Sequence, residues 1–121
     1  RRFPKRGKYR LPYAEALLRE GKTKEALREV EAGLNLELPK RTIAMMWILR
    51  ARIVLEISAS AGEDCEQIDA IEAWVDEAER SIKESISTGV EVPNSGMIQR
   101  QLQRRRTTLQ EICPYTRKES Q

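Results

Sequence analysis

The chain has 121 residues, of which 34% are charged and only 5% are aromatic, and it contains no histidine. Ala, Leu, Ile, Glu and Arg dominate, while glycine and proline are scarce, so the composition favours helices over sheet. No apolar run approaches the length of a membrane-spanning helix. We expect one domain with a modest core.

The termini and the cysteines give expectations about processing and location. No apolar run follows the basic N-terminus, so no signal peptide is expected. Because the sequence begins with Arg1, we expect a piece of a longer protein or a processed product. A small secreted fold would carry more cysteine than Cys65 and Cys113. We therefore expect two reduced thiols and a cytoplasmic location, with a nuclear location or a Cys65–Cys113 disulfide as alternatives.

Five helices are expected, and the first two form a pair. The first helix covers about residues 11–20, where apolar residues recur at helical spacing. Gly21 ends it by adopting a positive φ. Thr23 caps the second helix, whose apolar stripe continues to Leu38 and which Pro39 stops.

The third helix differs from the others in its apolar pattern. Residues 41–60 are apolar almost all round, so this helix should be covered on more than one side and form the centre of the domain. An acidic run leads into the fourth helix, which carries one apolar stripe and ends at Gly89. Asn94 or Ser95 caps the last helix, whose other face is rich in arginine.

These elements predict a simple domain organisation. Residues 11–113 form a single all-helical domain of about five antiparallel helices. A basic, flexible segment at 1–10 precedes it, and a frayed tail at 114–121 follows it.

The first helical pair resembles a tetratricopeptide repeat, a unit of about 34 residues in which small and large contact positions alternate. Ala14 stands at the small position of the first helix, and Gly21 stands at the turn. Ala26 followed by Val30 matches the small-then-large pair of the second helix. The resemblance covers roughly residues 7–40.

A second, distorted copy of the repeat covers about residues 44–93. Its matching positions are Trp47, Ala51, Val54, Ala78 and Ile82. It departs from the pattern because Arg50 stands where an aliphatic residue is expected and because the unit is longer. The last helix would then cap the stack. An unrelated helical bundle is the alternative fold.

A tetratricopeptide-like stack implies a non-enzymatic scaffold or regulatory module. Such stacks bind a peptide, a helix or a partner subunit in a groove lined by the first helix of each pair. The resemblance places the following residues in that groove: Glu15, Leu18, Arg19, Met45, Ile48, Arg52 and Glu56. The apolar third helix also needs cover, which either the long fourth helix and the capping helix or a partner would supply; the partner would be a second copy in a homodimer or a larger parent chain.

No catalytic, metal or cofactor site is expected. Without histidine there is no Ser/His/Asp or Cys/His arrangement, and no glycine-rich phosphate loop occurs. Asp69, Glu72 and Asp76 share one helical face, which would suit a cation or acid–base chemistry. A solvated acidic stripe that pairs with the Arg-rich last helix is the favoured interpretation.

The alternative function is nucleic-acid binding or transcription regulation. The net charge of +3 conceals basic ends around an acidic segment at 61–93. Clustered basic groups attract phosphates. The candidate contact residues are Arg1, Arg2, Lys5, Arg6, Lys8, Arg10, Arg100, Arg104, Arg105 and Arg106. The protein-interaction function is favoured, because opposite charge blocks also neutralise each other within a fold.

Overall fold

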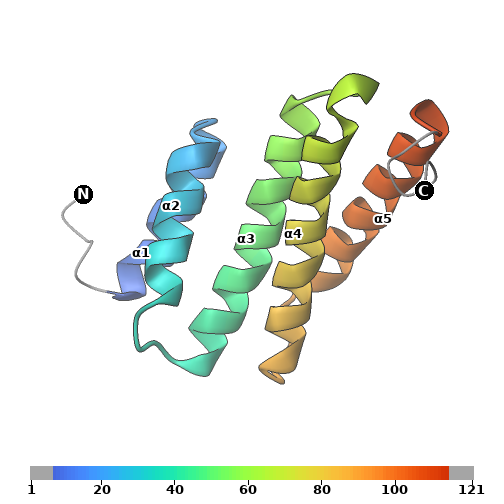
Figure 1. Cartoon of the computed structure of the whole chain (residues 1–121). Coiled ribbons are helices and arrows are strands. Elements are labelled where there is room, and N and C mark those ends of the chain that lie inside the picture. Colours follow the sequence, from blue (N-terminus) through green and yellow to red (C-terminus); the bar gives the residue numbers. More distant parts are fainter. Residues whose placement is uncertain (1–6, 115–121) are drawn as a thin grey trace.

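The computed structural model describes residues 7–114, and these form five α-helices, one short 3-10 helix and no strand. The prediction of an all-helical protein is therefore confirmed. Figure 1 shows α3, α4 and α5 side by side, each running opposite to the helix before it. The helices are α1 (Gly7–Arg19), α2 (Thr23–Leu34), α3 (Lys40–Ser60), η1 (Cys65–Gln67), α4 (Ile68–Ser87) and α5 (Ser95–Ile112).

The N-terminal boundary differs from the prediction. Helix α1 begins at Gly7, so the described residues of the basic segment, 7–10, are helical. Arg10 is partly buried there, and its guanidinium lies 2.9 Å from a carboxylate oxygen of Glu29 on α2. Because this ion pair joins two helices, no pattern within α1 predicts it. The sequence therefore places the start of α1 too late. The predicted flexible and frayed ends at 1–6 and 115–121 lie outside the described residues.

The turn between α1 and α2 depends on Gly21, as predicted. Its φ is +80°, a conformation that costs little only for glycine. The Gly21 N–H donates to the Leu18 carbonyl, and the Lys22 N–H donates to the Leu17 carbonyl. Because this turn is so tight, Thr23 is already the first residue of α2, and the prediction that it caps the helix is wrong.

Helix α2 is shorter than predicted. It ends at Leu34 rather than at Leu38, with Asn35 as its C-terminal cap. A proline disfavours helical dihedral angles only at the residue directly before it, so Pro39 acts on Leu38 and does not itself account for the end at Leu34. Pro39 instead precedes α3 as its N-cap.

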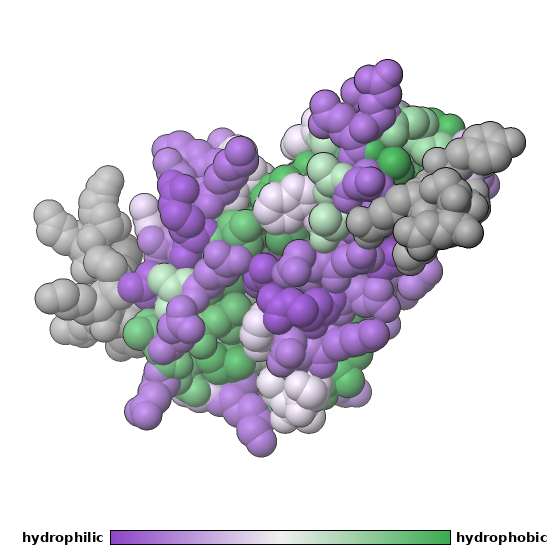
Figure 2. Space-filling view, in the orientation of Figure 1, coloured by the Kyte–Doolittle hydropathy of each residue, from purple (hydrophilic) through white to green (hydrophobic). Residues whose placement is uncertain are grey.

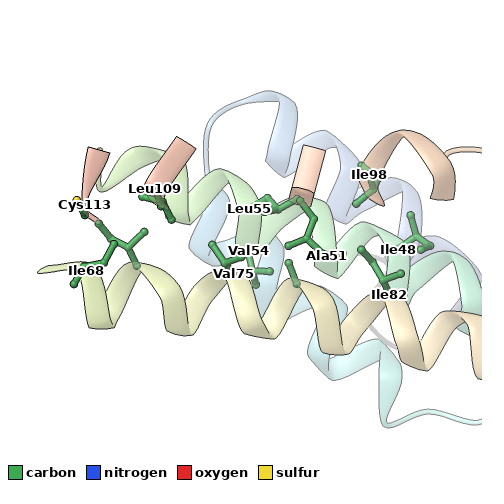
Figure 3. Close-up of a cluster of buried hydrophobic side chains, with 13 residues drawn as sticks. Ile48, Ala51, Val54, Leu55, Ile68, Val75, Ile82, Ile98, Leu109 and Cys113 are labelled. Atoms are coloured by element: carbon green, nitrogen blue, oxygen red, sulfur yellow. The ribbon is translucent and has the colours of Figure 1, made fainter. Parts of the chain in front are cut away.

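The core consists of two hydrophobic clusters that share α3. One cluster joins α1, α2 and α3, and the other joins α3, α4 and α5. Figure 3 shows the second cluster, in which Ile48, Ile82 and Ile98 from three helices converge. Each fully buried aliphatic side chain of this kind contributes about 1.5–3 kcal/mol.

Helix α3 is the centre of the domain, as predicted. It packs against α1, α2, α4 and α5. Most of its apolar circumference is thereby covered within the chain, although Met45 and Trp47 are only partly buried. Figure 2 shows that the molecular face seen in Figure 1 is largely hydrophilic.

Small residues bring the helices close together. Four alanines at the positions that resemble the repeat pattern have no exposed surface. They are Ala14, Ala26, Ala51 and Ala78. Gly33 serves the same purpose on α2, because a Cβ atom there would lie 2.7 Å from Cε of the buried Met46. A larger residue at these sites would push the helices apart.

The two cysteines form a disulfide, which corrects the expectation of two reduced thiols. Cys65 begins η1 and Cys113 directly follows α5, with their Cα atoms 5.5 Å apart. The residues are 48 positions apart in sequence, so only the packing of α5 along α3 and α4 brings them together. The bond ties the end of α5 to the link between α3 and α4.

Candidate interaction groove

Two hollows adjoin along α3 and form what we call the inner groove. The smaller hollow has a volume of about 150 Å³ and the larger about 470 Å³. Arg52, Met97 and Ile98 line both, so the hollows lie next to each other. The groove is built from α1, α3, α5 and the α4–α5 link, which comprises residues 88–94.

The floor of the smaller hollow is apolar. Met45 and Ile48 come from α3, and Val92 and Met97 come from the link and α5. Met97 is 45% exposed although it is large and apolar. A volume near 150 Å³ has room for about one aliphatic side chain of a bound partner.

The structure brings together five of the seven residues predicted for the groove. Glu15, Met45, Ile48 and Arg52 line the smaller hollow, and Glu56 joins Arg52 in the larger one. The other two lie elsewhere. Leu18 is buried in the cluster of α1, α2 and α3, and Arg19 is exposed at the end of α1. Neither lines the two hollows.

The sequence reasoning missed the side of the groove formed by the last helix and its link. Val92, Pro93 and Asn94 line the smaller hollow, and Gln101 and Arg105 line the larger one. From the sequence, residues 90–93 are expected only as an extended link between the last two helices. The signal that could have revealed this wall is Met97, an apolar residue one position before the buried stripe of α5.

The charges on the rim differ in their surroundings. Arg52 lines the groove between Glu15 and Glu56, and no ion pair within 4.0 Å joins it to a described acidic residue. Arg105 is bound on several sides. It donates to the Ser58 hydroxyl and carbonyl and to the Gly62 carbonyl, and it pairs with Glu63. Arg52 is therefore the rim cation with freedom to meet a partner's carboxylate.

A second group of charges lies between α2, α3 and α4. The Arg50 side chain is only 8% exposed, and its guanidinium contacts Glu31 at 3.1 Å and Glu77 at 3.0 Å. It also donates to the Ser81 hydroxyl at 2.7 Å. Arg50 therefore replaces the expected aliphatic residue with an ionic contact that joins three helices.

The Arg50 contact also affects the acidity of Glu77. Burial by itself raises the pKa of Glu77, because it disfavours the charged carboxylate. The hydrogen bond from Arg50 and the positive charges of Arg50 and Arg80 outweigh burial, so the pKa of Glu77 lies below its ordinary value. Arg80 also lies over the Trp47 ring, 5.5 Å from its centroid.

The acidic face of α4 pairs with the Arg-rich helix at one position. Arg106 contacts Asp76 at 3.1 Å and also pairs with Glu79. This contact agrees with the interpretation of the acidic stripe as an ion-pair partner of α5. Within residues 7–114, no group of three or more Cys, Asp or Glu residues is placed to hold a metal ion.

The residues predicted for nucleic-acid binding do not form one surface in the described chain. Arg1, Arg2, Lys5 and Arg6 lie outside it, and the side chain of Lys8 is not described. Arg10, Arg105 and Arg106 are engaged in ion pairs inside the fold. Arg100 and Arg104 are exposed together on α5.

The comparisons with known proteins give no relative. No protein-family model matches this chain, and no curated protein or solved structure matches it significantly. None of the helices described between residues 7 and 114 is long and apolar enough to cross a membrane. The fold and the groove thus define an all-helical protein whose family is not shown.

Proposed function

We propose that this chain is a non-enzymatic protein-interaction module that binds a peptide segment in the inner groove. The observation that supports this proposal most is the composition of the groove. Its apolar floor comes from α3, α5 and the link, and it lies beside Arg52, an exposed cation. A peptide that places one aliphatic side chain in the smaller hollow and a carboxylate against Arg52 fits this arrangement.

Four features support a tetratricopeptide-like stack with a capping helix. The small positions of both units are buried, and Gly21 has the positive φ of the predicted turn. Helix α3 packs against both α1 and α5, as the first helices of successive units would. The face of α5 around Arg100 and Arg104 is polar and exposed, which suits the outer side of a cap. An unrelated bundle could share these features.

The proposal is tested with a displayed library of short random peptides. Peptides selected on the disulfide-bonded chain should bind Met97→Asp and Arg52→Glu at least about tenfold more weakly, a loss of about 1.4 kcal/mol. Both residues are exposed enough for the fold to tolerate the change, which circular dichroism checks. Arg28→Glu, on exposed α2 surface outside the groove, should bind within about twofold of the original chain.

The same selection can contradict the proposal. Failure to enrich any peptide would argue against a peptide groove, and so would peptides that bind both groove variants normally.

A homodimer remains a prediction that sedimentation at several concentrations would test. A monomer at all concentrations would count against it.

Nucleic-acid binding is the second candidate, supported by exposed Arg100 and Arg104 together with the basic N-terminus. It predicts affinity for a generic oligonucleotide that falls steeply with salt. Replacing both arginines by glutamine should reduce this affinity. An affinity that changes neither with salt nor with these substitutions would exclude binding through the phosphates.

The cytoplasmic location also remains a prediction, and the disulfide argues against it. Disulfides persist in oxidising compartments and are rare in the cytosol and nucleus. Acid trapping and alkylation of the chain directly in cells would show which state Cys65 and Cys113 occupy. Two alkylated thiols would support a cytoplasmic or nuclear location, and a protected pair would contradict it.

A further inference from the structure

The two ends of the disulfide have different access to solvent. Cys65 is exposed in η1, whereas Cys113 is only 3% exposed. Figure 3 shows Cys113 at one end of the cluster, near Ile68 and Leu109. Thiol–disulfide exchange requires that a thiolate reach one of the two sulfur atoms. A dissolved thiolate therefore meets Cys65 first.

Among the residues that the structure describes, the charges around Cys65 are mostly negative. Glu63, Asp64 and Glu66 flank it in the link, and Glu111 is exposed near the end of α5. One nearby cation, Arg105, is already paired with Glu63 at 3.2 Å. Such surroundings repel an anionic thiol and attract a cationic one, and salt weakens both effects.

We propose that Cys65 is a thiol-exchange site for neutral or cationic small thiols, and that exchange there releases the end of α5. The incoming thiolate forms a bond to the Cys65 sulfur while the Cys65–Cys113 bond breaks. The electron pair leaves on the Cys113 sulfur, which takes a proton from water. A second small thiol then attacks the incoming sulfur, which releases a small-molecule disulfide and leaves Cys65 reduced.

Release of α5 follows from how this helix is held. Only three of its 18 residues are buried, compared with seven of 20 in α4. Arg105 is bound to the end of α3 and to the α3–α4 link. Between Arg105 and the disulfide, Leu109 is the one buried residue of α5. Without the covalent bond, residues 106–112 keep Leu109 and the ion pairs of Arg106 with Asp76 and Glu79 but lose their terminal anchor. This inference does not depend on what the inner groove binds.

The exchange step is tested by kinetics with three small thiols. The probes are cysteamine, 2-mercaptoethanol and 2-mercaptoethanesulfonate, which are cationic, neutral and anionic. Rate constants are expressed per thiolate and referred to the same chain unfolded in urea. At about 0.01 M salt, cysteamine should exceed the sulfonate by about threefold or more, and this preference should nearly vanish at about 0.5 M.

The position of attack is read from the first product. Brief reaction, alkylation of the released thiol and peptide mapping should show the adduct on Cys65 and the alkyl group on Cys113. Glu66→Lys should reduce the preference for cysteamine, whereas Glu84→Lys, exposed near the far end of α4, should leave it unchanged. Adducts mainly on Cys113, or equal rates for all three thiols at low salt, would overturn the assignment.

The release of α5 is tested by amide hydrogen exchange on the oxidised and reduced chain, without any peptide. Residues 106–112 should lose at least about tenfold more protection than α2 does. A uniform loss over all helices would show that the bond stabilises the fold without releasing α5 selectively. Because no ligand is present, this result is independent of the peptide-binding test.

Discussion

At the scale of single residues, Arg50 shows how one position departs from a repeat pattern without breaking the fold. The pattern calls for an aliphatic side chain, yet Arg50 is buried and joined to Glu31 and Glu77. Both carboxylates keep part of their surface in solvent, so the charges are only partly desolvated. The hydrogen bond to Ser81 satisfies another donor.

We predict that Arg50→Met lowers the free energy of unfolding by about 1–3 kcal/mol. The change keeps most of the apolar volume but leaves Glu77 and Ser81 without their buried donor. Urea denaturation followed by circular dichroism measures the effect. Arg52→Met on the same helix is the control and should stay within about 0.5 kcal/mol, because Arg52 is exposed. Equal losses in both variants would refute a special role for Arg50.

Glu77 makes the stability of the chain depend on pH. Its pKa is lower in the folded chain than the ordinary value of 4.5 expected when unfolded, so the unfolded state binds the proton more readily. The stabilisation is fully present above pH 4.5 and is lost as the pH falls through the folded pKa. Glu77→Gln should therefore reduce the stability difference between neutral and acidic solution.

Denaturation curves of Glu77→Gln at pH 7 and at about pH 3 measure this dependence. Glu84→Gln, an exposed change on the same helix, should keep the pH profile of the original chain. If the Glu77 variant keeps that profile as well, its carboxylate does not contribute in this range.

At the scale of elements, turns were more predictable than helix ends. Gly21 was identified as the turn because a positive φ is a local requirement. The start of α1 was not identified, because the Arg10–Glu29 pair joins two helices, and the end of α2 lies at Leu34, several residues before the predicted one. The Arg10 contact stabilises the first turns of α1 by an interaction that no pattern within that helix contains.

The Gly21 turn supplies a matched pair of glycine variants. Gly21→Ala should lower the free energy of unfolding by about 1–2 kcal/mol, since alanine is strained at a φ of +80°. Gly96→Ala, in the first turn of α5, would place its Cβ atom 3.7 Å from Nη1 of Arg100, an ordinary contact, and should be neutral or stabilise by up to about 1 kcal/mol. Thermal or urea denaturation compares the two. If Gly96→Ala destabilised the chain more than Gly21→Ala does, the positive φ of Gly21 would not be what makes alanine unfavourable there.

At the scale of the whole molecule, α3 and the disulfide organise the chain. Helix α3 contributes to both hydrophobic clusters. The Cys65–Cys113 bond joins the C-terminal end of α5 to the segment between α3 and α4. The acidic α4 and the basic α5 also neutralise each other through Arg106, Asp76 and Glu79. The charge blocks seen in the sequence are thus partly satisfied inside the fold.

We predict that reducing the disulfide lowers the free energy of unfolding by about 4 kcal/mol, from the entropy of the loop that it closes. The separation of 48 residues sets this magnitude. Urea denaturation with and without a reductant measures it, and Cys65→Ser combined with Cys113→Ser should match the reduced chain. A loss below about 1 kcal/mol would mean that non-covalent packing alone holds α5.

The sequence by itself determined the helical class, the central position of α3, the Gly21 turn and five residues of the inner groove. The first three follow from local periodicity and from single residues with strong conformational preferences, whereas the groove residues follow from the resemblance to a tetratricopeptide repeat. Tertiary structure alone decided the disulfide, the Arg50 contact and the wall around Met97. Each of these joins residues far apart in sequence, and their distance in space depends on how whole helices pack, which no local pattern records.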